Sequence, residues 1–537
     1  MEFAILIVLI FAGVVGVTIY SKRQSIKTLH ARILTAFGNM PDADDMDMDS
    51  IRAYANRAPE HDLRIDKITW SDLDMDSVYK RVNACFSSVG EEYLYNCLHE
   101  PQFNEEILHT REEIMNFFDQ RPNQRVAAQF ALARLGKSRH NGVAALIFNA
   151  DIKMLPRHLL FKILAATPLV FAAVLPFSLT VGIMGLILSF IVNLAFYYNA
   201  MRFVDLEMPA IGYFASMVGC VGRLYGIKGL GGLPIMKNLE KPYIIYKNAI
   251  KKAPSGKGMG ADITDLFWTY FNIMFLIDVR RYNNFMQLVA KNGDAFHEIY
   301  KTIGEIDTAL AVLSFRKSLP FHSTPQFSDK NELAFDNIYH PLIKQPVTNT
   351  HIFNSDSLIT GSNASGKSTF IKTLAINGIL AQTIYTCTAT KFATRFAMVV
   401  TSMAMRDDLL GGESYFIVEI NSLKRVLDMV AKYPCVCYVD EILRGTNTAE
   451  RIAASAAILT HLYSQDCLCV VASHDIELTR LLSHANYHFC EQVTDGDIVF
   501  DYKLKKGPTT TRNAIKLLEV MGFNPDIVSQ ANNLAGN

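Results

Sequence analysis

The sequence predicts a multidomain protein in which transmembrane helices accompany an all-α core domain and an α/β domain follows. Three observations predict this fold class. Two apolar segments reach membrane-spanning length, two regions between Ile68 and Lys317 show helical spacing of apolar residues, and short apolar strands alternate with helices after about Asn331. The predicted parts are an anchor at residues 1–22, an acidic linker at 23–66, a helical core at 67–330 with an inserted hairpin at 159–198, and an α/β domain at 331–537.

The overall charge argues against a protein coated with nucleic-acid-binding side chains. Lysine plus arginine and aspartate plus glutamate each number 52 in the 537 residues, so there is no global basic field, although a local patch stays open. Half of the residues (50%) are hydrophobic, which is somewhat above the composition of an ordinary soluble domain. The excess lies in the apolar segments.

The first apolar segment, Phe3–Tyr20, carries no charge and is about 18 residues long, close to the minimum for a membrane-spanning helix. Glu2 precedes it, and Lys22 and Arg23 follow it. This charge order favours a retained anchor with the N-terminus outside and the rest of the chain on the cytoplasmic side. The alternative is a cleaved signal peptide, although such peptides carry positive charge before the apolar run.

The second apolar segment, Leu159–Tyr198, is nearly uncharged after Lys162 and is about 40 residues long, enough for two membrane spans. Pro176 starts the turn that divides it, because proline removes a helix donor. Lys162 before the hairpin and Arg202 after it predict that both ends lie on the cytoplasmic side, in agreement with the anchor. The alternative is a hydrophobic core hairpin of a soluble protein.

Two other apolar features are predicted to lie in a protein core. Leu266–Ile277 has about 12 residues, which is too short to span a membrane, and is predicted as a buried core helix. The pairs Cys435/Cys437 and Cys467/Cys469 alternate within apolar runs, so each pair faces one side of a strand. We interpret them as small core residues in a reducing compartment rather than as metal ligands.

A phosphate-binding loop follows a predicted strand at 357–360 and opens a predicted helix at Lys367. The stretch Gly-Ser-Asn-Ala-Ser-Gly-Lys-Ser fits the pattern G-x-x-x-x-G-K-[ST]. Backbone N–H groups of such a loop wrap phosphates, the lysine reaches the β- and γ-phosphates, and the serine hydroxyl binds Mg²⁺. The predicted nucleotide-binding residues of the loop are Gly361, Ser362, Asn363, Ala364, Ser365, Gly366, Lys367, Ser368 and Thr369.

Two later strands end in residues suited to phosphoryl chemistry. The run Cys-Val-Cys-Tyr-Val-Asp-Glu ends in Asp440, predicted to hold Mg²⁺ together with Ser368, and Glu441, predicted as the general base. His474 follows the next apolar strand, where it is predicted to sense the γ-phosphate. The predicted catalytic residues are therefore Glu441, His474 and Lys367. The structural alternative is a charged strand end and an ordinary loop histidine.

The four stretches ITGSNASGKSTFIKTLAINGILAQ, DDLLGGESYFIVEI, YVDEILRGTNTAER and VVASHDIELTRL closely resemble the ATPase domain of the MutS family, the mismatch-repair branch of the ABC-type ATPases. The resemblance covers roughly residues 331–537 and is specific, because the motifs occur in order. Upstream, SSVGEEYLYNCLHEP, REEIMNFF and EIDTALAVLSF are more weakly similar to the helical core of the family.

The resemblance implies binding and hydrolysis of ATP with Mg²⁺ by a homodimer that sandwiches two nucleotides. It implies that Ser414 reaches the γ-phosphate bound by the partner subunit and that Asn363 is the asparagine of the loop. It also implies that Thr446 and Thr448 fall in the segment at the dimer interface. Tyr502 takes the place of a ring that packs on adenine, and a strand core aromatic is the alternative.

The sequence departs from the family in several respects, including side-chain choices at loop positions 362, 364 and 365 that should leave ATP binding intact. Leu443 stands where the family usually has glycine, which puts the interface geometry and the turnover rate in doubt. The mismatch-reading and connector domains of repair members have no counterpart, since the anchor and linker take their place. Phe103-Asn104-Glu105 has the letters of the mismatch-reading motif, but it lies between core helices and is not expected to be a DNA wedge.

These observations predict a membrane-anchored ATPase that couples hydrolysis to conformational change, with no small-molecule metabolic substrate beyond ATP. A membrane-tethered module that binds mismatched or branched DNA is the alternative, and a transport ATPase is a weaker one. A lysine-rich stretch could contact nucleic acid or anionic lipid, or could be a solvated face. Its members are Lys237, Lys241, Lys247, Lys251, Lys252 and Lys257.

Overall fold

The structure of the chain, a computed structural model, describes residues 20–21, 23–42, 46–138, 142–148, 154–156, 158–204, 207–250, 263–361, 365–403, 415–443, 446–482, 484–494, 497–508, 515, 518 and 521–535. Several predicted features lie outside these residues. They are the apolar run up to Ile19, the loop residues Ser362, Asn363 and Ala364, the signature residue Ser414, and Lys251, Lys252 and Lys257.

The chain forms two compact units, and each combines segments that are separated in the sequence. The first unit comprises Met1–Pro59, Asn83–Asn96 and Glu113–Ser314, and the second comprises Glu60–Val82, Cys97–Glu112 and Phe315–Asn537. The predicted domain boundary at residue 331 stays a prediction, and the second unit also includes two earlier segments. Part of the predicted linker at 23–66 is helical, at residues 23–36 and 48–51.

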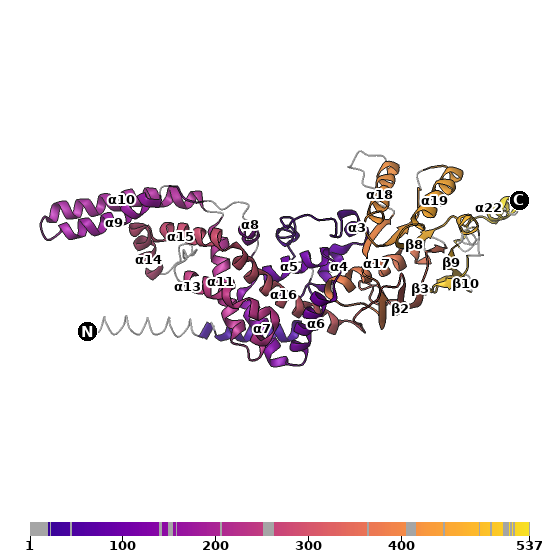
Figure 1. Cartoon of the computed structure of the whole chain (residues 1–537), viewed down its shortest axis with the longest axis horizontal. Coiled ribbons are helices and arrows are strands. Elements are labelled where there is room, and N and C mark those ends of the chain that lie inside the picture. Colours follow the sequence, from indigo (N-terminus) through magenta and orange to yellow (C-terminus); the bar gives the residue numbers. More distant parts are fainter. Residues whose placement is uncertain are drawn as a thin grey trace. The chain divides into compact units, whose positions relative to one another are not determined.

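The described part of the first unit is helical (Figure 1). Helices α5 (Ser88–His99), α6 (Glu105–Asp119) and α16 (Gly293–Ser318) contribute residues to both units. The other elements of the first unit are α2 (Met48–Ile51), α7 (Pro122–Leu135), α8 (Val143–Ile147), α9 (His158–Val174), α10 (Leu179–Phe203), α11 (Met208–Tyr225), η1 (Leu230–Gly232), α12 (Pro234–Asn238), α13 (Glu240–Ile250), α14 (Ile263–Phe275) and α15 (Ile277–Lys291).

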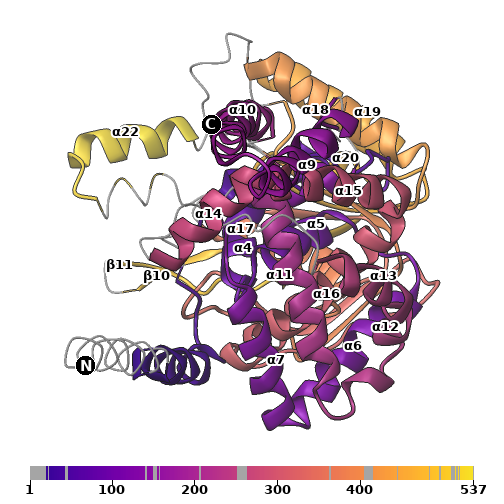
Figure 2. The same cartoon turned by 90° about the vertical axis from the view of Figure 1, so that its left-hand side faces the viewer.

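Helices α9 and α10 form an antiparallel pair, which Figure 2 shows nearly end-on. The predicted break at Pro176 is confirmed, because α9 ends at Val174 and α10 begins at Leu179. Among the described residues, α10 is the one helix long and apolar enough to cross a membrane, and α9 is a shorter apolar helix. Only 22% of the most apolar 18-residue stretch of α10 is buried, which is unlike the core helix of a soluble protein.

The prediction that Leu266–Ile277 is a buried core helix is wrong. The corresponding helix α14 packs against α9 and α10, but it leaves Trp268, Tyr270 and Phe271 exposed. The physical reason is that α9 and α10 themselves present apolar side chains outward, and α14 extends this apolar surface instead of filling a core. We call the exposed apolar side chains of α9, α10, α14 and the turn between α9 and α10 the apolar surface; it includes Leu159, Ile163, Leu169, Val170, Phe177, Leu179, Val181, Ile183, Met184, Ile187, Leu188, Ile191, Trp268, Tyr270 and Phe271.

The second unit is an α/β domain (Figure 1). Its helices are α3 (Lys67–Asp72), α4 (Met75–Val82), α17 (Lys367–Ile384), α18 (Tyr415–Val430), α19 (Thr448–Leu462), α20 (Leu478–Leu481) and α22 (Pro525–Ala535). Its strands are β1 (Gln326–Phe327), β2 (Leu333–Ile338), β3 (Asn349–Phe353), β4 (Ser357–Thr360), β5 (Lys391–Thr394), β6 (Met398–Met403), β7 (Cys435–Asp440), β8 (Cys467–Ser473), β9 (Ala485–His488), β10 (Glu491–Thr494), β11 (Asp497–Phe500) and β12 (Lys505–Lys506).

The main sheet has six strands in the order β12-β9-β4-β8-β7-β6, parallel except for the short β12 at one edge. Helix α17 covers one face through contacts with β6, β7 and β8, and α18 and α19 pack on the other. The four predicted strand cysteines are buried in the core under α18 and α19, with Cys435 paired to Cys467 and Cys437 to Cys469 in the strand register. Their prediction as small core residues is confirmed.

Candidate functional site

The predicted site residues come from the ends of three neighbouring parallel strands. In the register of the sheet, Thr360 of β4 pairs with Ser473 of β8, and Asp440 of β7 pairs with Ala472 of β8. Because the carboxyl ends of parallel strands meet at one edge, the residues that follow them gather there. The structure therefore brings together the described part of the phosphate loop, the carboxylates at the end of β7, and His474 after β8.

The two glycines of the loop have backbones that require glycine. Gly361 has φ of +142°, and a Cβ atom there would lie 2.4 Å from the backbone oxygen of Phe489. Gly366 has φ of +97° and caps the N-terminus of α17. Side chains other than hydrogen are strained or excluded at both positions, so the glycine spacing of the motif follows from the path of the chain.

Lys367, the first residue of α17, is buried, and its ammonium group donates a hydrogen bond to the backbone oxygen of Gly361. Ser365 is also buried, Ser368 is half-buried and Thr369 is exposed. The N-terminus of a long helix carries unpaired N–H groups and a positive dipole end, which together favour an anion. The start of α17 therefore combines a cation, hydroxyl groups and N–H donors in one place.

Asp440 and Glu441 are both nearly fully buried at the end of β7. The N–H group of Glu441 donates to the backbone oxygen of Ala472 at 2.9 Å, so the ladder between β7 and β8 continues one residue past the strand. Glu441 has φ of +61°, a left-handed conformation that costs a non-glycine residue about 1 kcal/mol or more. Strained backbones of this kind occur at functional sites, where the surrounding structure holds them.

His474 contacts both carboxylates that flank it. Its Nδ1 lies 3.4 Å from Oε2 of Glu441, and its Nε2 lies 3.6 Å from Oδ1 of Asp475. The interaction with Glu441 raises the pKa of His474 above its usual value of 6.5, although partial burial opposes the shift. The predicted histidine and the predicted base are thus direct neighbours.

A second pair, which the sequence reasoning missed, supports this histidine. Arg451 on α19 donates two hydrogen bonds to the Asp475 carboxylate, from Nε at 2.9 Å and from a terminal nitrogen at 2.7 Å. This bidentate geometry is the strong form of an arginine–carboxylate pair. The available signal was weak: Asp475 directly follows His474, and Arg451 lies in the stretch YVDEILRGTNTAER, which carries the family resemblance.

Tyr502 lies in the loop between β11 and β12, so the alternative of a strand core aromatic is excluded. Its side chain is 43% exposed, and a Cβ atom at Gly366 would lie 2.8 Å from its Cδ1 atom. Asn349 holds this loop with two hydrogen bonds, from its Nδ2 to the backbone oxygen of Tyr502 at 3.0 Å and from the N–H of Leu504 to its Oδ1 at 2.9 Å.

A cavity of about 340 Å³ lies between Tyr502 and the start of α17. It is mostly apolar beside the loop, because its walls include Ile338, Ile343, Val347 and Phe370, with His340 also lining it. Burial lowers the pKa of His340 to about 4, and its ring is therefore neutral at pH 7. A neutral, largely apolar pocket beside a phosphate loop suits a planar heterocyclic base.

The remaining predicted residues lie around the start of α19. The Thr446 hydroxyl contacts Glu450 at 3.3 Å, Asn447 caps the helix and Thr448 is its first residue. Leu443 is buried with φ of +57°, which gives a physical reason for the glycine that the resembling family has at this position. Ser414 and the central loop residues Ser362, Asn363 and Ala364 lie outside the described residues.

Comparison with known proteins identifies this part of the chain. Residues 357–537 match the family MutS domain V. Proteins named DNA mismatch repair protein MutS are similar to the chain: that of Streptococcus uberis is 28% identical over 257 residues, covering 45% of this chain and 30% of the relative. The Thermotoga maritima protein is 28% identical over 255 residues, covering 45% and 32%, and the Thermus thermophilus protein is 27% identical over 250 residues, covering 45% and 30%.

The chain spans about a third of the length of the curated relatives that it matches. The match covers the α/β domain, whose phosphate loop, carboxylate pair and histidine lie at one edge of the parallel sheet. The match of residues 357–537 to MutS domain V and the similarity to MutS proteins over this part of the chain support membership of the α/β domain in the MutS family.

Proposed function

We propose that this chain is a membrane-anchored ATPase that binds ATP between two copies of itself and couples hydrolysis to a conformational change. The loop from Gly361 to Thr369 and the ammonium group of Lys367 would hold the phosphates. Glu441 would accept a proton from the attacking water, and His474 would sense the terminal phosphate. The cavity beside Tyr502 would take the adenine ring.

One observation carries the proposal. The predicted base Glu441 and the predicted sensor His474 lie 3.4 Å apart although they are 33 positions apart in the sequence, and both lie at the sheet edge where the phosphate loop begins. A structural ion pair alone would not require Lys367, hydroxyl groups and a helix N-terminus at the same edge. The relatives named DNA mismatch repair protein MutS support the assignment of this edge to nucleotide chemistry.

The donor set fits a magnesium ion. Ser368 offers a hydroxyl oxygen at the start of α17 and Asp440 a carboxylate oxygen at the end of β7. Mg²⁺ prefers oxygen ligands and is usually held by one or two protein groups together with phosphates and water. When bound, the ion would neutralise charge on the phosphates, while Ser368 and Asp440 would hold it at the edge of the sheet.

A homodimer follows from the resemblance of the α/β domain to MutS proteins. Ser414 would reach the nucleotide bound by the partner subunit, and Thr446 and Thr448 would lie near the shared surface. Thr446 is half-buried and Thr448 is exposed at the start of α19, which agrees with a role near an interface. Replacement of Ser414 by alanine should reduce hydrolysis without much loss of ATP affinity, because this serine would act across the dimer.

The bilayer is the proposed partner of the apolar surface. Helix α10 has 25 residues, about 37 Å in length, and most of its apolar side chains are exposed. Lys162 and Arg202 both lie at the open end of the α9–α10 pair, which favours the cytoplasmic side for that end and for the α/β domain. We propose that Phe3–Tyr20 adds a further span with the N-terminus outside.

Binding of mismatched or branched DNA is the second candidate function, and the names of the relatives favour it. The equal numbers of basic and acidic residues oppose it. Binding of detergent-solubilised protein to a four-way junction should be measured between about 50 and 200 mM salt. A steep loss of affinity with salt would favour DNA as a ligand, and absence of binding at low salt would remove this candidate.

The ATPase proposal is tested with Glu441→Gln. This variant should bind ATP with unchanged affinity and lose about 100-fold or more of its hydrolysis rate, because amides are poor bases. Light scattering should show that ATP converts it to a lasting dimer. Glu477→Gln, which neutralises an exposed carboxylate three residues after His474, is the matched control and should hydrolyse ATP normally. Unchanged turnover in Glu441→Gln would exclude Glu441 as the base.

A further inference from the structure

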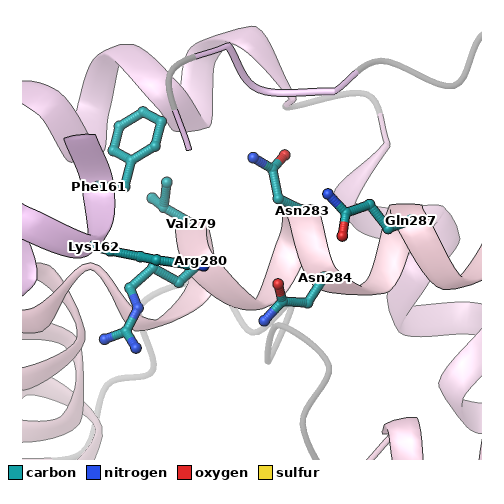
Figure 3. A pocket seen from close by; sticks show the side chains of 7 residues that line it. All are labelled: Phe161, Lys162, Val279, Arg280, Asn283, Asn284 and Gln287. Carbon is teal, nitrogen blue, oxygen red and sulfur yellow. The ribbon is translucent and has the colours of Figure 1, made fainter. Parts of the chain in front are cut away.

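A small polar pocket lies between α9 and α15 in the first unit (Figure 3). Its volume is about 110 Å³, well above the roughly 10–15 Å³ that a single water molecule requires. Figure 3 shows Lys162 of α9 and Arg280 of α15 at one end of the pocket and Asn284 and Gln287 of α15 at the other. The pocket therefore offers two cations and two side-chain amides, and its size suits a phosphate group.

The cations of this pocket are not neutralised by the protein in the part of the chain that the structure describes. Lys162 and Arg280 are exposed, and neither forms a salt bridge with a described carboxylate. The nearest acidic residue in the sequence, Asp278, is buried and is held by Asn272, whose Nδ2 donates to its Oδ2 at 2.6 Å. The positive charge at the pocket is thus available to an external anion.

The wall of the pocket is firmly built. Asn283 is buried and exchanges two hydrogen bonds with the backbone of Leu155, which accepts at 3.0 Å and donates at 2.9 Å. These bonds fix the segment before α9 to α15. Phe161 and Val279 are buried beside the two cations and hold the backbones from which Lys162 and Arg280 extend. A preorganised wall lowers the entropy that binding costs.

The pocket also has a defined place relative to the apolar surface. Lys162 lies near the start of α9, and the 12 residues from Ile163 to Val174 extend the helix by about 18 Å toward the hairpin turn. Exposed apolar side chains occupy this length and the neighbouring α10 and α14. If these helices lie in a bilayer, as the proposed function states, then Lys162 and Arg280 lie at the foot of the embedded part, at the level of the lipid headgroups.

We propose that this pocket binds the phosphate of an anionic phospholipid headgroup. Arg280 can bind two phosphate oxygens at once through its planar guanidinium group, and Lys162 adds a second positive charge. Asn284 and Gln287 can donate to the polar part of the headgroup. The pocket would thereby fix the depth and rotation of the helical unit in the cytoplasmic leaflet. The proposal rests on the membrane part of the proposed function.

The test uses the full chain in an uncharged detergent and follows its melting temperature during titration with short-chain phosphatidylglycerol. We expect saturable stabilisation, with phosphatidylcholine much weaker. The double variant Lys162→Gln/Arg280→Gln should require roughly tenfold more phosphatidylglycerol or more. Lys291→Gln, an exposed lysine at the end of α15 outside the pocket, is the matched control, and Lys162→Arg should bind normally.

Each other outcome is decisive. If the double variant binds phosphatidylglycerol with the same affinity as the wild type, the pocket is not the lipid site. If inorganic phosphate stabilises the wild type as much as phosphatidylglycerol does, the pocket is a site for free phosphate rather than for lipid. The membrane part of the proposed function is tested separately by carbonate extraction of cell membranes. A chain that stays in the membrane but shows no effect of the double variant contradicts the headgroup site alone, whereas a chain in the soluble fraction contradicts the membrane proposal.

Discussion

Nδ1 of His474 lies 3.4 Å from Oε2 of Glu441, so an exposed imidazole faces a nearly buried carboxylate across the ends of β8 and β7. The other ring nitrogen lies 3.6 Å from Asp475, which Arg451 binds with two hydrogen bonds. When His474 is protonated, two positive and two negative groups alternate across these elements. This arrangement joins the end of β7, the loop after β8 and the first turns of α19.

The raised pKa of His474 predicts a pH-dependent contribution to stability. The folded protein holds the imidazole proton more tightly than the unfolded chain does, so the stabilisation is fully present below pH 6.5 and is lost as the pH rises through the higher folded pKa. The difference in melting temperature between wild type and His474→Gln should therefore be largest below pH 6.5 and should shrink as the pH rises above this value. In a Glu441→Gln background this pH dependence should be much weaker. A difference that stays constant with pH would contradict the role of Glu441.

The close packing around Gly361 predicts that its replacement by alanine strongly lowers both stability and ATP affinity. Gly361→Ala would place its Cβ atom 2.4 Å from the backbone oxygen of Phe489 in a left-handed backbone, and should cost at least about 2 kcal/mol of unfolding free energy and most of the ATP affinity. Gly212→Ala is the control. It lies in α11 with no atom within 4 Å of the added Cβ, and should stabilise by about 0.5–1 kcal/mol. Similar effects of both substitutions would contradict this account of the loop.

The local structure around the candidate site was predictable because strong local sequence signals determine it. Strand β4 and the start of α17 lie where the sequence predicts them. A glycine that can adopt φ of +97°, followed by a helix-forming run, leaves few other conformations between a strand and a helix. In the same way, Pro176 predicted the break between α9 and α10, and the apolar runs at 435–440 and 467–473 predicted strands β7 and β8.

Contacts between segments that are far apart in the sequence could not be predicted, because no local sequence pattern indicates them. Asp72 on α3 accepts hydrogen bonds from the Thr401 hydroxyl at 2.7 Å and from the N–H of Met403 at 3.1 Å, at the end of the edge strand β6. Nothing near Asp72 in the sequence shows that its partner lies 329 positions later. Arg451 and Asp475 are a similar case. The burial of α14 was predicted wrongly because length and flanking charge do not reveal that its neighbours α9 and α10 expose apolar faces.

The backbone conformation of Leu443 predicts that its replacement by glycine costs less stability than its replacement by alanine, which is the reverse of the usual order. Its side chain is buried, but its backbone has φ of +57°, where glycine is favoured over alanine by about 1 kcal/mol or more. Leu443→Ala should lower the free energy of unfolding by about 2–4 kcal/mol. Leu443→Gly should lower it by less, although it removes more atoms. At Leu459, which is fully buried within α19, glycine should cost about 1 kcal/mol more than alanine. Chemical unfolding of the four variants measures both orders, and the same order at both positions would exclude backbone strain at Leu443.

Asn193 joins three helices of the apolar surface through backbone groups that their own helices cannot satisfy. Its Nδ2 donates to the backbone oxygens of Leu164 in α9 at 3.1 Å and of Met274 in α14 at 2.7 Å. The Leu164 oxygen lacks its usual helical donor because residue 168 is proline, although Thr167 also donates to it at 2.8 Å. The Met274 oxygen lies at the end of α14, where Leu276 with φ of +49° stops the helix.

This geometry predicts coupling between Asn193 and Pro168. Asn193→Leu should lower the unfolding free energy by about 1–2 kcal/mol, because it leaves a partly buried carbonyl group in α14 without this donor and removes one donor to a carbonyl group in α9. In a Pro168→Ala background the new N–H group can bond to Leu164, so the same substitution should cost roughly half as much. Ser189→Ala is the control, since this buried hydroxyl donates to the backbone oxygen of Leu186 within its own helix α10 and should show no coupling to Pro168. Unfolding in mixed detergent micelles measures the cycle, and additive effects of the Asn193 and Pro168 substitutions would show that Asn193 does not replace the missing helical donor.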